Sequence, residues 1–337
     1  MKAIAIVPGT AGSLIIERPE PSIAAPDEVK VKIIRVGICG TDRTELSGGR
    51  ADPPDGQKNL VIGHEMFGKV LEVGSSVTRV KAGDFAVFTV RRGCGHCAPC
   101  QMTRSDMCQT GKYKERGIHG LDGYQTEFVV DKEQYLVSVP ANLEAVGVLM
   151  EPLSIVEKAI DEALQLQIRR SPEAAVTPAW IVGRRCLVAG LGPVGLLACM
   201  VLRLRGAQVY GLDVVDSTSA RPKWLDVIGG HYVDGRQLPA DQVQKKIGAM
   251  DFVLDASGIA SLEFNLLDAL GRNGVYVITG IPADHHPLQI PGAELVRSWF
   301  WVIRSCWEAS TLRVATFKWL WMIWLLLTCA GALTSPP

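Results

Sequence analysis

The sequence predicts a two-domain α/β protein in which a β-rich domain precedes a doubly wound parallel sheet. Its 337 residues, 47% of them hydrophobic, are enough for two separate cores. Before residue 150, short alternating stretches such as "EVKVKIIRVG" and "DFAVFTV" are broken by glycine, as is typical of β-rich domains. Later segments alternate apolar strands with helices, which favours a parallel sheet. We expect the two domains to cover residues 1–155 and 156–297.

The second domain is indicated by "RCLVAGLGPVGLLACMVLRLRGAQVYGLDVVD", which reads as a strand, a glycine turn, a helix and a second strand. The stretches "AMDFVLDASG" and "NGVYVITGIP" predict two more buried strands, and "IASLEFNLLDALGR" between them has helical spacing. The stretch "EALQLQIRRSPEAAVTPAWIVG" has two prolines near polar residues. We expect it to form an exposed excursion from the helix that connects the domains.

Charge and the first residues limit the compartment and the partners. The 35 basic and 35 acidic side chains cancel, and neither sign forms a long block, so nucleic acid is not an expected partner. The opening "MKAIAIVPG" is too short an apolar run for a secretion signal. We therefore expect a cytoplasmic, thiol-reducing setting with a small-molecule substrate and no membrane partner.

Four cysteines crowd into "CGHCAPCQMTRSDMC". In a reducing compartment, four thiolates can close a tetrahedral zinc shell, and the glycines and proline between them let the loop fold back on itself. The alternative is a set of buried cysteines without metal, which a polar loop does not favour. We predict a structural zinc site with no open coordination position, formed by Cys94, Cys97, Cys100 and Cys108.

A dinucleotide site is predicted at the glycine turn "GLGPVG". Gly190 makes the tight turn, Gly192 lets the backbone approach a pyrophosphate, and Gly195 lets helix and strand pack closely. Pro193 and Val194 begin the helix whose N-terminus faces the phosphates.

The choice of nicotinamide cofactor depends on the end of the second strand. Asp213 can accept hydrogen bonds from the ribose hydroxyls and repel a 2′-phosphate, which favours NAD over NADP. Arg221 in the following loop can accommodate a phosphate, although it also reads as a solvated surface charge.

The motifs occur in a familiar order: "GICGTD", "GHEMFGKVLEVGSSVTRVKAGD", the four cysteines, "MEPLS" and "VAGLGPVG". Over roughly residues 1–297 the chain resembles the zinc-dependent medium-chain alcohol dehydrogenases. "TGKYKERGIHGLDGYQTEFVVD" and "LMEPLSIVEKAI" resemble the glucose 1-dehydrogenase branch. The resemblance implies a GroES-like catalytic domain followed by a Rossmann NAD(P)-binding domain, in a family of homo-oligomers.

The resemblance also implies a catalytic zinc ion bound by Cys39, His64 and Glu151, with a fourth position open for water or substrate. Glu65 is then a nearby carboxylate able to approach the metal. Asp42 is expected to orient the His64 imidazole.

Two further residues are assigned by the resemblance, each with a plain alternative. Thr41 would pass the substrate proton towards the cofactor ribose and solvent, or its hydroxyl satisfies the local turn. Glu115 would accept hydrogen bonds from sugar hydroxyls, or it pairs with Lys114 or Arg116 on the surface. The implied reaction is oxidation of glucose at C1 to the lactone; oxidation of another polyol or secondary alcohol is the alternative.

The last forty residues, 298–337, do not fit this scheme. They hold most of the tryptophans and a single acidic residue, Glu308, and their uncharged run is shorter than the ~20 residues that cross a bilayer. Permitted codons for these residues, read in another frame, encode "LVLGNQVMLGSVNASRGHFQMAVDDL", which resembles the C-terminal segment of the family. We interpret 298–337 as a frameshifted tail, and a catalytically dead remnant is therefore the alternative to an active enzyme.

Overall fold

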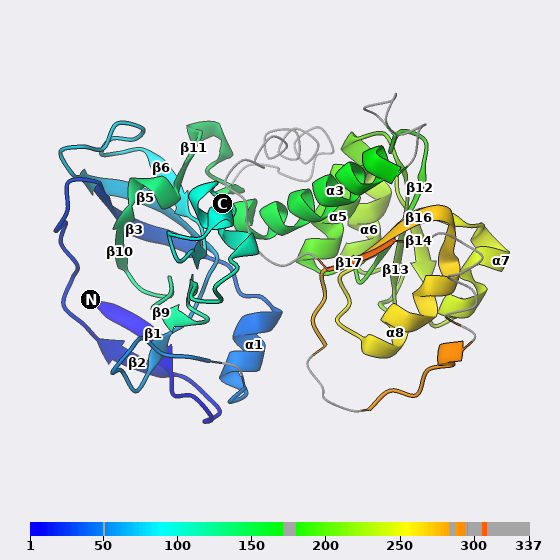
Figure 1. Ribbon diagram of the computed structural model, residues 1–337, viewed down its shortest axis with the longest axis horizontal. Helices are drawn as coiled ribbons and strands as arrows, with labels where there is room; N and C mark the ends of the chain where they lie inside the picture. Colours follow the sequence, from blue (N-terminus) through cyan, green and yellow to red (C-terminus); the bar gives the residue numbers. More distant parts are fainter. Residues whose placement is uncertain (50, 171–179, 283–286, 294, 296–304, 309–337) are drawn as a thin grey trace. The chain divides into compact units, whose positions relative to one another are not determined.

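The computed structural model describes residues 1–49, 51–170, 180–282, 287–293, 295 and 305–308, and it divides the chain into two compact units (Figure 1). Unit 1 comprises Met1–Ser154 among these residues, and unit 2 begins at Ile155.

Unit 1 is β-rich, as predicted. A five-stranded antiparallel sheet has the order β10-β3-β5-β6-β11, and two three-stranded sheets have the orders β2-β1-β4 and β7-β8-β9. Short helices lie in the connections. The elements are β1 (Lys2–Ile6), β2 (Leu14–Glu17), β3 (Glu28–Val36), α1 (Gly40–Leu46), β4 (Leu60–Val61), β5 (Met66–Val73), β6 (Phe85–Phe88), β7 (Arg91–Arg92), α2 (Ala98–Gln101), the 3₁₀ helix η1 (Ser105–Met107), β8 (Lys114–Arg116), β9 (Gly120–Leu121), β10 (Phe128–Lys132) and β11 (Leu136–Val139).

Unit 2 contains a parallel sheet of order β14-β13-β12-β15-β16-β17. This is the strand order of a doubly wound dinucleotide-binding domain, so the predicted fold class is confirmed. Helix α3 (Met150–Arg170) starts in the last residues of unit 1 and continues in unit 2. The other elements are β12 (Arg185–Ala189), α5 (Pro193–Leu204), β13 (Gln208–Asp213), α6 (Ala220–Val227), β14 (His231–Asp234), α7 (Val243–Ile247), β15 (Met250–Asp255), α8 (Ala260–Asn265), β16 (Leu270–Ile278) and β17 (Ser305–Glu308).

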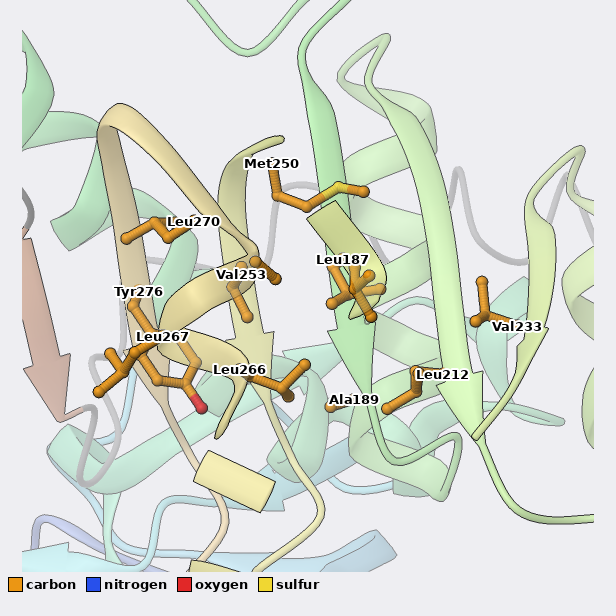
Figure 2. Close-up of a cluster of buried hydrophobic side chains, with 12 residues drawn as sticks. Leu187, Ala189, Leu212, Val233, Met250, Val253, Leu266, Leu267, Leu270 and Tyr276 are labelled. Atoms are coloured by element: carbon orange, nitrogen blue, oxygen red, sulfur yellow. The ribbon is translucent and has the colours of Figure 1, made fainter. Parts of the chain in front are cut away.

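The core of unit 2 fixes the strands that carry the glycine turn. Leu187 and Ala189 of β12 are fully buried, as is Val253 of the neighbouring strand β15, and they pack in one cluster with Leu266 and Tyr276 (Figure 2). Strands covered on both faces need such apolar runs. The carboxyl end of β12, where the glycine turn begins, is therefore anchored in a well-packed sheet.

The predicted excursion after residue 161 is wrong in its first part. Helix α3 continues to Arg170, and Ala163 and Gln167 on it are buried. The Gln167 side-chain amide donates to the Asn273 carbonyl at 2.8 Å, which ties the end of the helix to the rest of unit 2. Residues 171–179 of the predicted excursion lie outside the described residues.

Part of the tail belongs to the sheet. Although the frameshift hypothesis puts an unrelated sequence here, strand β17 pairs in parallel with β16, in the register Val275 with Ser305. A physical reason is that the outer edge of β16 offers unpaired backbone groups, which even a short segment satisfies. The other tail residues, 298–304 and 309–337, lie outside the described part. Among the residues that the structure describes, no helix is long and apolar enough to span a membrane.

Candidate functional site

The first group of predicted ligands is built around Cys39, the residue that caps helix α1. The Cys39 Sγ accepts a hydrogen bond from the Thr41 amide at 3.2 Å, and the Cys39 amide donates to Asp42 Oδ2 at 2.8 Å. This reciprocal cap satisfies amides at the helix start that have no partner within the helix. The "CGTD" sequence thereby fixes the direction of the thiol.

His64 approaches the same thiol from the loop between β4 and β5. Its Nε2 lies 3.0 Å from Cys39 Sγ, and the neighbouring Glu65 carboxylate completes a cluster whose ligand atoms all lie within 4.8 Å of one another. A Cβ on Gly37 would lie 1.7 Å from Glu65 Oε2, so the glycine leaves the space that this carboxylate fills. The sequence motif did not indicate this role of Gly37.

The backbone next to His64 is in close contact with two other segments, and a glycine lies at each contact. A Cβ on Gly117 or Gly123 would lie 2.3 or 2.2 Å from the Gly63 carbonyl oxygen, and Gly63 itself has a φ of 93°. The Tyr124 amide donates to that same carbonyl at 2.8 Å. The segment that follows Glu115, residues 117–124, is therefore in direct backbone contact with Gly63, the residue that precedes His64.

The predicted carboxylates surround the imidazole at different distances. Asp42 Oδ1 lies 3.8 Å from His64 Nδ1, an ion-pair separation longer than a hydrogen bond. Glu151, in the first turn of α3, is outside the three-membered cluster among the described residues, but its charge acts on His64. The structure thus groups Glu65 with Cys39 and His64 within 4.8 Å, whereas the predicted ligand Glu151 acts on His64 through its charge. Glu45 on α1 is also buried here and was not predicted.

The electrostatics of this cluster favour a cation. Burial raises the pKa of Cys39 to about 11 and that of Glu151 to about 8, and neighbouring acidic groups add to both shifts. Burial alone would lower the pKa of His64, but Glu151 and Asp42 reverse the direction and raise it. A dication at this point would favour the deprotonated thiol and carboxylates. Thiolate, imidazole and carboxylate are also the ligand types of zinc, so these residues fit a zinc ion.

Thr41 and Glu115 have different surroundings. Thr41 is half-buried and lies two residues from Cys39. Glu115 on β8 is buried, and its Oε1 accepts hydrogen bonds from Arg91 Nε at 3.0 Å and Arg91 Nη2 at 2.7 Å.

The alternative partners expected for Glu115 are engaged elsewhere. Lys114 reaches Asp55 at 3.4 Å, and Arg116 reaches Asp131 at 2.6 Å. The surface pairing with either of them is therefore wrong, and Arg91 is a residue that sequence reasoning missed. The double arginine before the cysteines in "RRGCGHC" was the available signal.

The four-cysteine lobe gathers as the spacing predicts. The sulfur atoms of Cys94, Cys97, Cys100 and Cys108 all lie within 4.8 Å of one another. Hydrogen bonding from the Thr110 hydroxyl lowers the pKa of Cys94 to about 5 and that of Cys108 to about 7, whereas burial raises the pKa of Cys100 to about 12. Four converging thiols of which two ionise readily fit a closed structural zinc site.

We predict that Cys97→Ser lowers both the zinc content and the melting temperature without abolishing cofactor binding. The substitution removes one of four thiolates from unit 1, whereas the glycine turn lies in unit 2. The loss of a structural metal removes part of the apparent ~10–16 kcal/mol of zinc binding from the stability of the folded lobe. Metal analysis, thermal melting and nicotinamide titration measure the three quantities. Cys199→Ser, which changes a buried cysteine of unit 2, controls for the loss of a thiol. An unchanged zinc content in Cys97→Ser would contradict the site.

The glycine turn of unit 2 has the geometry expected of each glycine. Gly190 has a φ of 81°, and a Cβ on Gly195 would lie 1.8 Å from the Gly190 carbonyl oxygen. A Cβ on Gly192 would meet nothing within 4 Å, so the backbone there is open to a pyrophosphate. Helix α5 begins at Pro193 and continues through Val194, directly after Gly192. These residues fit a dinucleotide.

Asp213 at the end of β13 has two partners. Its Oδ2 accepts a hydrogen bond from the Leu191 amide at 2.8 Å, which holds the glycine turn, and pairs with Arg221 Nη1 at 3.2 Å. Arg221 is therefore an ion-pair partner of Asp213, and its side chain is also exposed to solvent.

Two family models match the chain. "Alcohol dehydrogenase GroES-like domain" matches residues 25–141, and "Glucose dehydrogenase C-terminus" matches residues 144–302. A glucose 1-dehydrogenase of Methanocella arvoryzae is 37% identical over 288 residues, which are 84% of this chain and 77% of the relative. Glucose 1-dehydrogenase 1 of Vulcanisaeta moutnovskia is 40% identical over 294 residues, 86% of this chain and 79% of the relative.

A solved structure has the same fold. The glucose dehydrogenase of Haloferax mediterranei, solved in complex with NADP, zinc and gluconolactone, superposes with a TM-score of 0.86 at 29% identity. The match covers 100% of this chain and 96% of that chain.

Proposed function

Because the chain belongs to the glucose dehydrogenase branch of the zinc-dependent medium-chain alcohol dehydrogenase superfamily, we propose that it oxidises D-glucose or a related aldose at C1. The products are the lactone and a reduced nicotinamide cofactor, NADH or NADPH. The observation that carries the proposal is the convergence of Cys39, His64 and Glu65 within 4.8 Å. Glucose as the substrate is supported by the names of the relatives and by the gluconolactone bound in the Haloferax structure.

The roles of the residues follow from their chemistry. Cys39, His64 and either Glu65 or Glu151 hold the catalytic zinc, which when bound polarises the substrate hydroxyl and eases the loss of its proton. Thr41, next to this cluster, accepts that proton at Oγ1 and passes it to solvent. The Glu115 carboxylate accepts hydrogen bonds from sugar hydroxyls.

The cofactor is held by unit 2. The open backbone at Gly192 and the start of α5 receive the pyrophosphate, and Asp213 accepts hydrogen bonds from the ribose.

The test is a substrate panel assayed by the absorbance of reduced nicotinamide. Glucose, galactose, xylose, several open-chain polyols and secondary alcohols are each offered with NAD and with NADP. Turnover that is fastest with an aldose supports the proposal, and preference for an open-chain polyol would replace it by the alternative function. Chelator treatment should remove activity, and zinc should restore it.

We predict that Asp213→Asn improves the use of NADP relative to NAD by about tenfold, which corresponds to ~1.4 kcal/mol. The substitution removes a charge that repels the 2′-phosphate and frees Arg221 from its ion pair, while the asparagine oxygen can keep the bond to the Leu191 amide. Steady-state kinetics with both cofactors measure the ratio. Asp216→Asn, in the same loop, controls for a general loss of negative charge. Equal losses with both cofactors in Asp213→Asn would place Asp213 away from the ribose.

We further propose that the protein works in the cytoplasm. Both candidate zinc sites use cysteine thiolates, and the cysteines of residues 1–199 are free thiols. Thiols persist in the reducing cytoplasm, whereas oxidising compartments convert close pairs into disulfides.

A further inference from the structure

We propose that Arg91 is a positioning residue for sugar binding, because it fixes the Glu115 carboxylate and ties it to the four-cysteine lobe. This inference rests on the proposed function, in which Glu115 accepts hydrogen bonds from the sugar. Arg91 itself does not touch the reacting atoms and acts through Glu115.

The geometry of the pair leaves half of the carboxylate for a ligand. Arg91 and Glu115 occupy directly opposed positions on β7 and β8, and each side chain is only 9% exposed. Both bonds from Arg91, at 3.0 and 2.7 Å, end on Oε1. The ion pair therefore fixes the orientation of Glu115 without using Oε2.

Arg91 is itself held on two other sides. Its guanidinium lies 3.9 Å from the centroid of the Tyr113 ring, and its Nη1 donates to the Asp106 carbonyl at 3.3 Å. Asp106 belongs to η1, which lies between Cys100 and Cys108 in the chain. A metal ion that closes the lobe thus also fixes the carbonyl that anchors Arg91.

These contacts require a guanidinium. A planar fork can stack on an aromatic ring, donate twice to one carboxylate and donate once more to a carbonyl, whereas a lysine ammonium is a compact charge that does not reproduce this set. Arg91→Lys keeps the positive charge but releases Glu115 from its fixed orientation.

The next residue provides a matched control. Arg92 is also on β7, is equally buried, and lies 3.9 Å from the centroid of the Tyr135 ring. Its partner is Asp131, at 2.6 Å, which has no role in the proposed reaction. Arg92→Lys therefore disturbs a similar buried pair while leaving Glu115 and its partner in place.

The experiment compares Arg91→Lys, Arg92→Lys, Glu115→Gln and the double variant Arg91→Lys/Glu115→Gln in the full-length protein. We measure KM and kcat for glucose, KM for the cofactor, the Kd of gluconolactone by calorimetry, zinc content and melting temperature. For Arg91→Lys we expect the sugar KM and the lactone Kd to rise about tenfold, the size of one lost charge-assisted hydrogen bond. The kcat and the cofactor KM should change by less than about twofold. Arg92→Lys should lower the melting temperature similarly without the rise in sugar KM.

The double variant tests whether Arg91 acts through Glu115. If it does, adding Arg91→Lys to Glu115→Gln raises the sugar KM no further. Equal effects of Arg91→Lys and Arg92→Lys on sugar KM, or no effect of Arg91→Lys, would overturn the inference.

Two further outcomes distinguish a failure of this inference from a failure of the proposed function on which it rests. If Glu115→Gln leaves the sugar KM unchanged in an active enzyme, Glu115 does not bind the sugar. The positioning role of Arg91 would then be wrong, while the dehydrogenase assignment would stand. A wild-type protein that neither oxidises glucose nor binds the lactone would overturn both.

Discussion

In His64→Ala, we expect the oxidation of glucose to fall by about a thousandfold or more, because the substitution removes a neutral nitrogen ligand from the catalytic zinc site. The His64 Nε2 lies 3.0 Å from the Cys39 thiol, so its loss leaves a gap among the three converging groups. The variant should lose about one zinc ion per chain and keep the one bound by the four cysteines. Metal analysis and steady-state kinetics on the same preparation measure both effects.

His96→Ala is the matched control for this substitution. His96 lies in the four-cysteine lobe and is exposed, and its Nδ1 contacts the Cys94 carbonyl at 2.8 Å, not a sulfur of the cluster. Its removal should leave both zinc ions and the activity in place. A His64→Ala variant that retains full zinc and full turnover would contradict the assignment of the catalytic site.

The second large effect concerns residues 298–337. We expect the chain as given to be recovered mainly in aggregates, and a chain carrying "LVLGNQVMLGSVNASRGHFQMAVDDL" from position 298 to be soluble and at least about tenfold more active per milligram. The reason lies in the sequence: the tail contains tryptophans at Trp299, Trp301, Trp319, Trp321 and Trp324, and large apolar patches and incomplete sheet edges promote association. The match to the family model ends at residue 302, close to the start of the tail.

The comparison needs three proteins: the chain as given, the chain with the alternative-frame peptide, and the chain ending at residue 297. The third separates the benefit of restoring the peptide from that of removing the apolar tail. Solubility, detergent extraction and glucose-dependent NAD reduction are measured for each. Recovery of the first protein from the lipid fraction in an active form would instead favour a membrane anchor, and a soluble, active first protein would refute the frameshift.

The sequence predicted those parts of the protein that depend on local spacing. The glycines at 190, 192 and 195 and the four cysteines could be assigned because each motif carries its geometry within a few residues. Contacts made across sheets could not be assigned in this way. The partner of Glu115 is Arg91 because β7 pairs with β8, and two neighbouring charges in sequence, Lys114 and Arg116, point to other carboxylates.

The end of helix α3 and the choice of carboxylate ligand were also not predictable from local spacing. The prolines near residue 172 suggested an early excursion, but packing of Ala163 and Gln167 extends α3 to Arg170. The family motif favoured Glu151 over Glu65 as a ligand, whereas the space beside Gly37 brings Glu65 into the tight cluster. Such preferences depend on the volume left by residues distant in the chain, which no local pattern reports.

The close backbone contact of Gly63, Gly117 and Gly123 limits which positions of this enzyme can be changed in redesign. Any side chain at Gly117 or Gly123 would displace the carbonyl that precedes His64, so random libraries that include these positions will consist largely of misfolded clones. His119 flanks the same segment and is partly exposed, so it can be varied in a search for new sugar specificities, whereas Tyr113 packs on Arg91 and should be kept. Evolution of the substrate range is thus confined to side chains around a backbone crossing that must itself stay fixed.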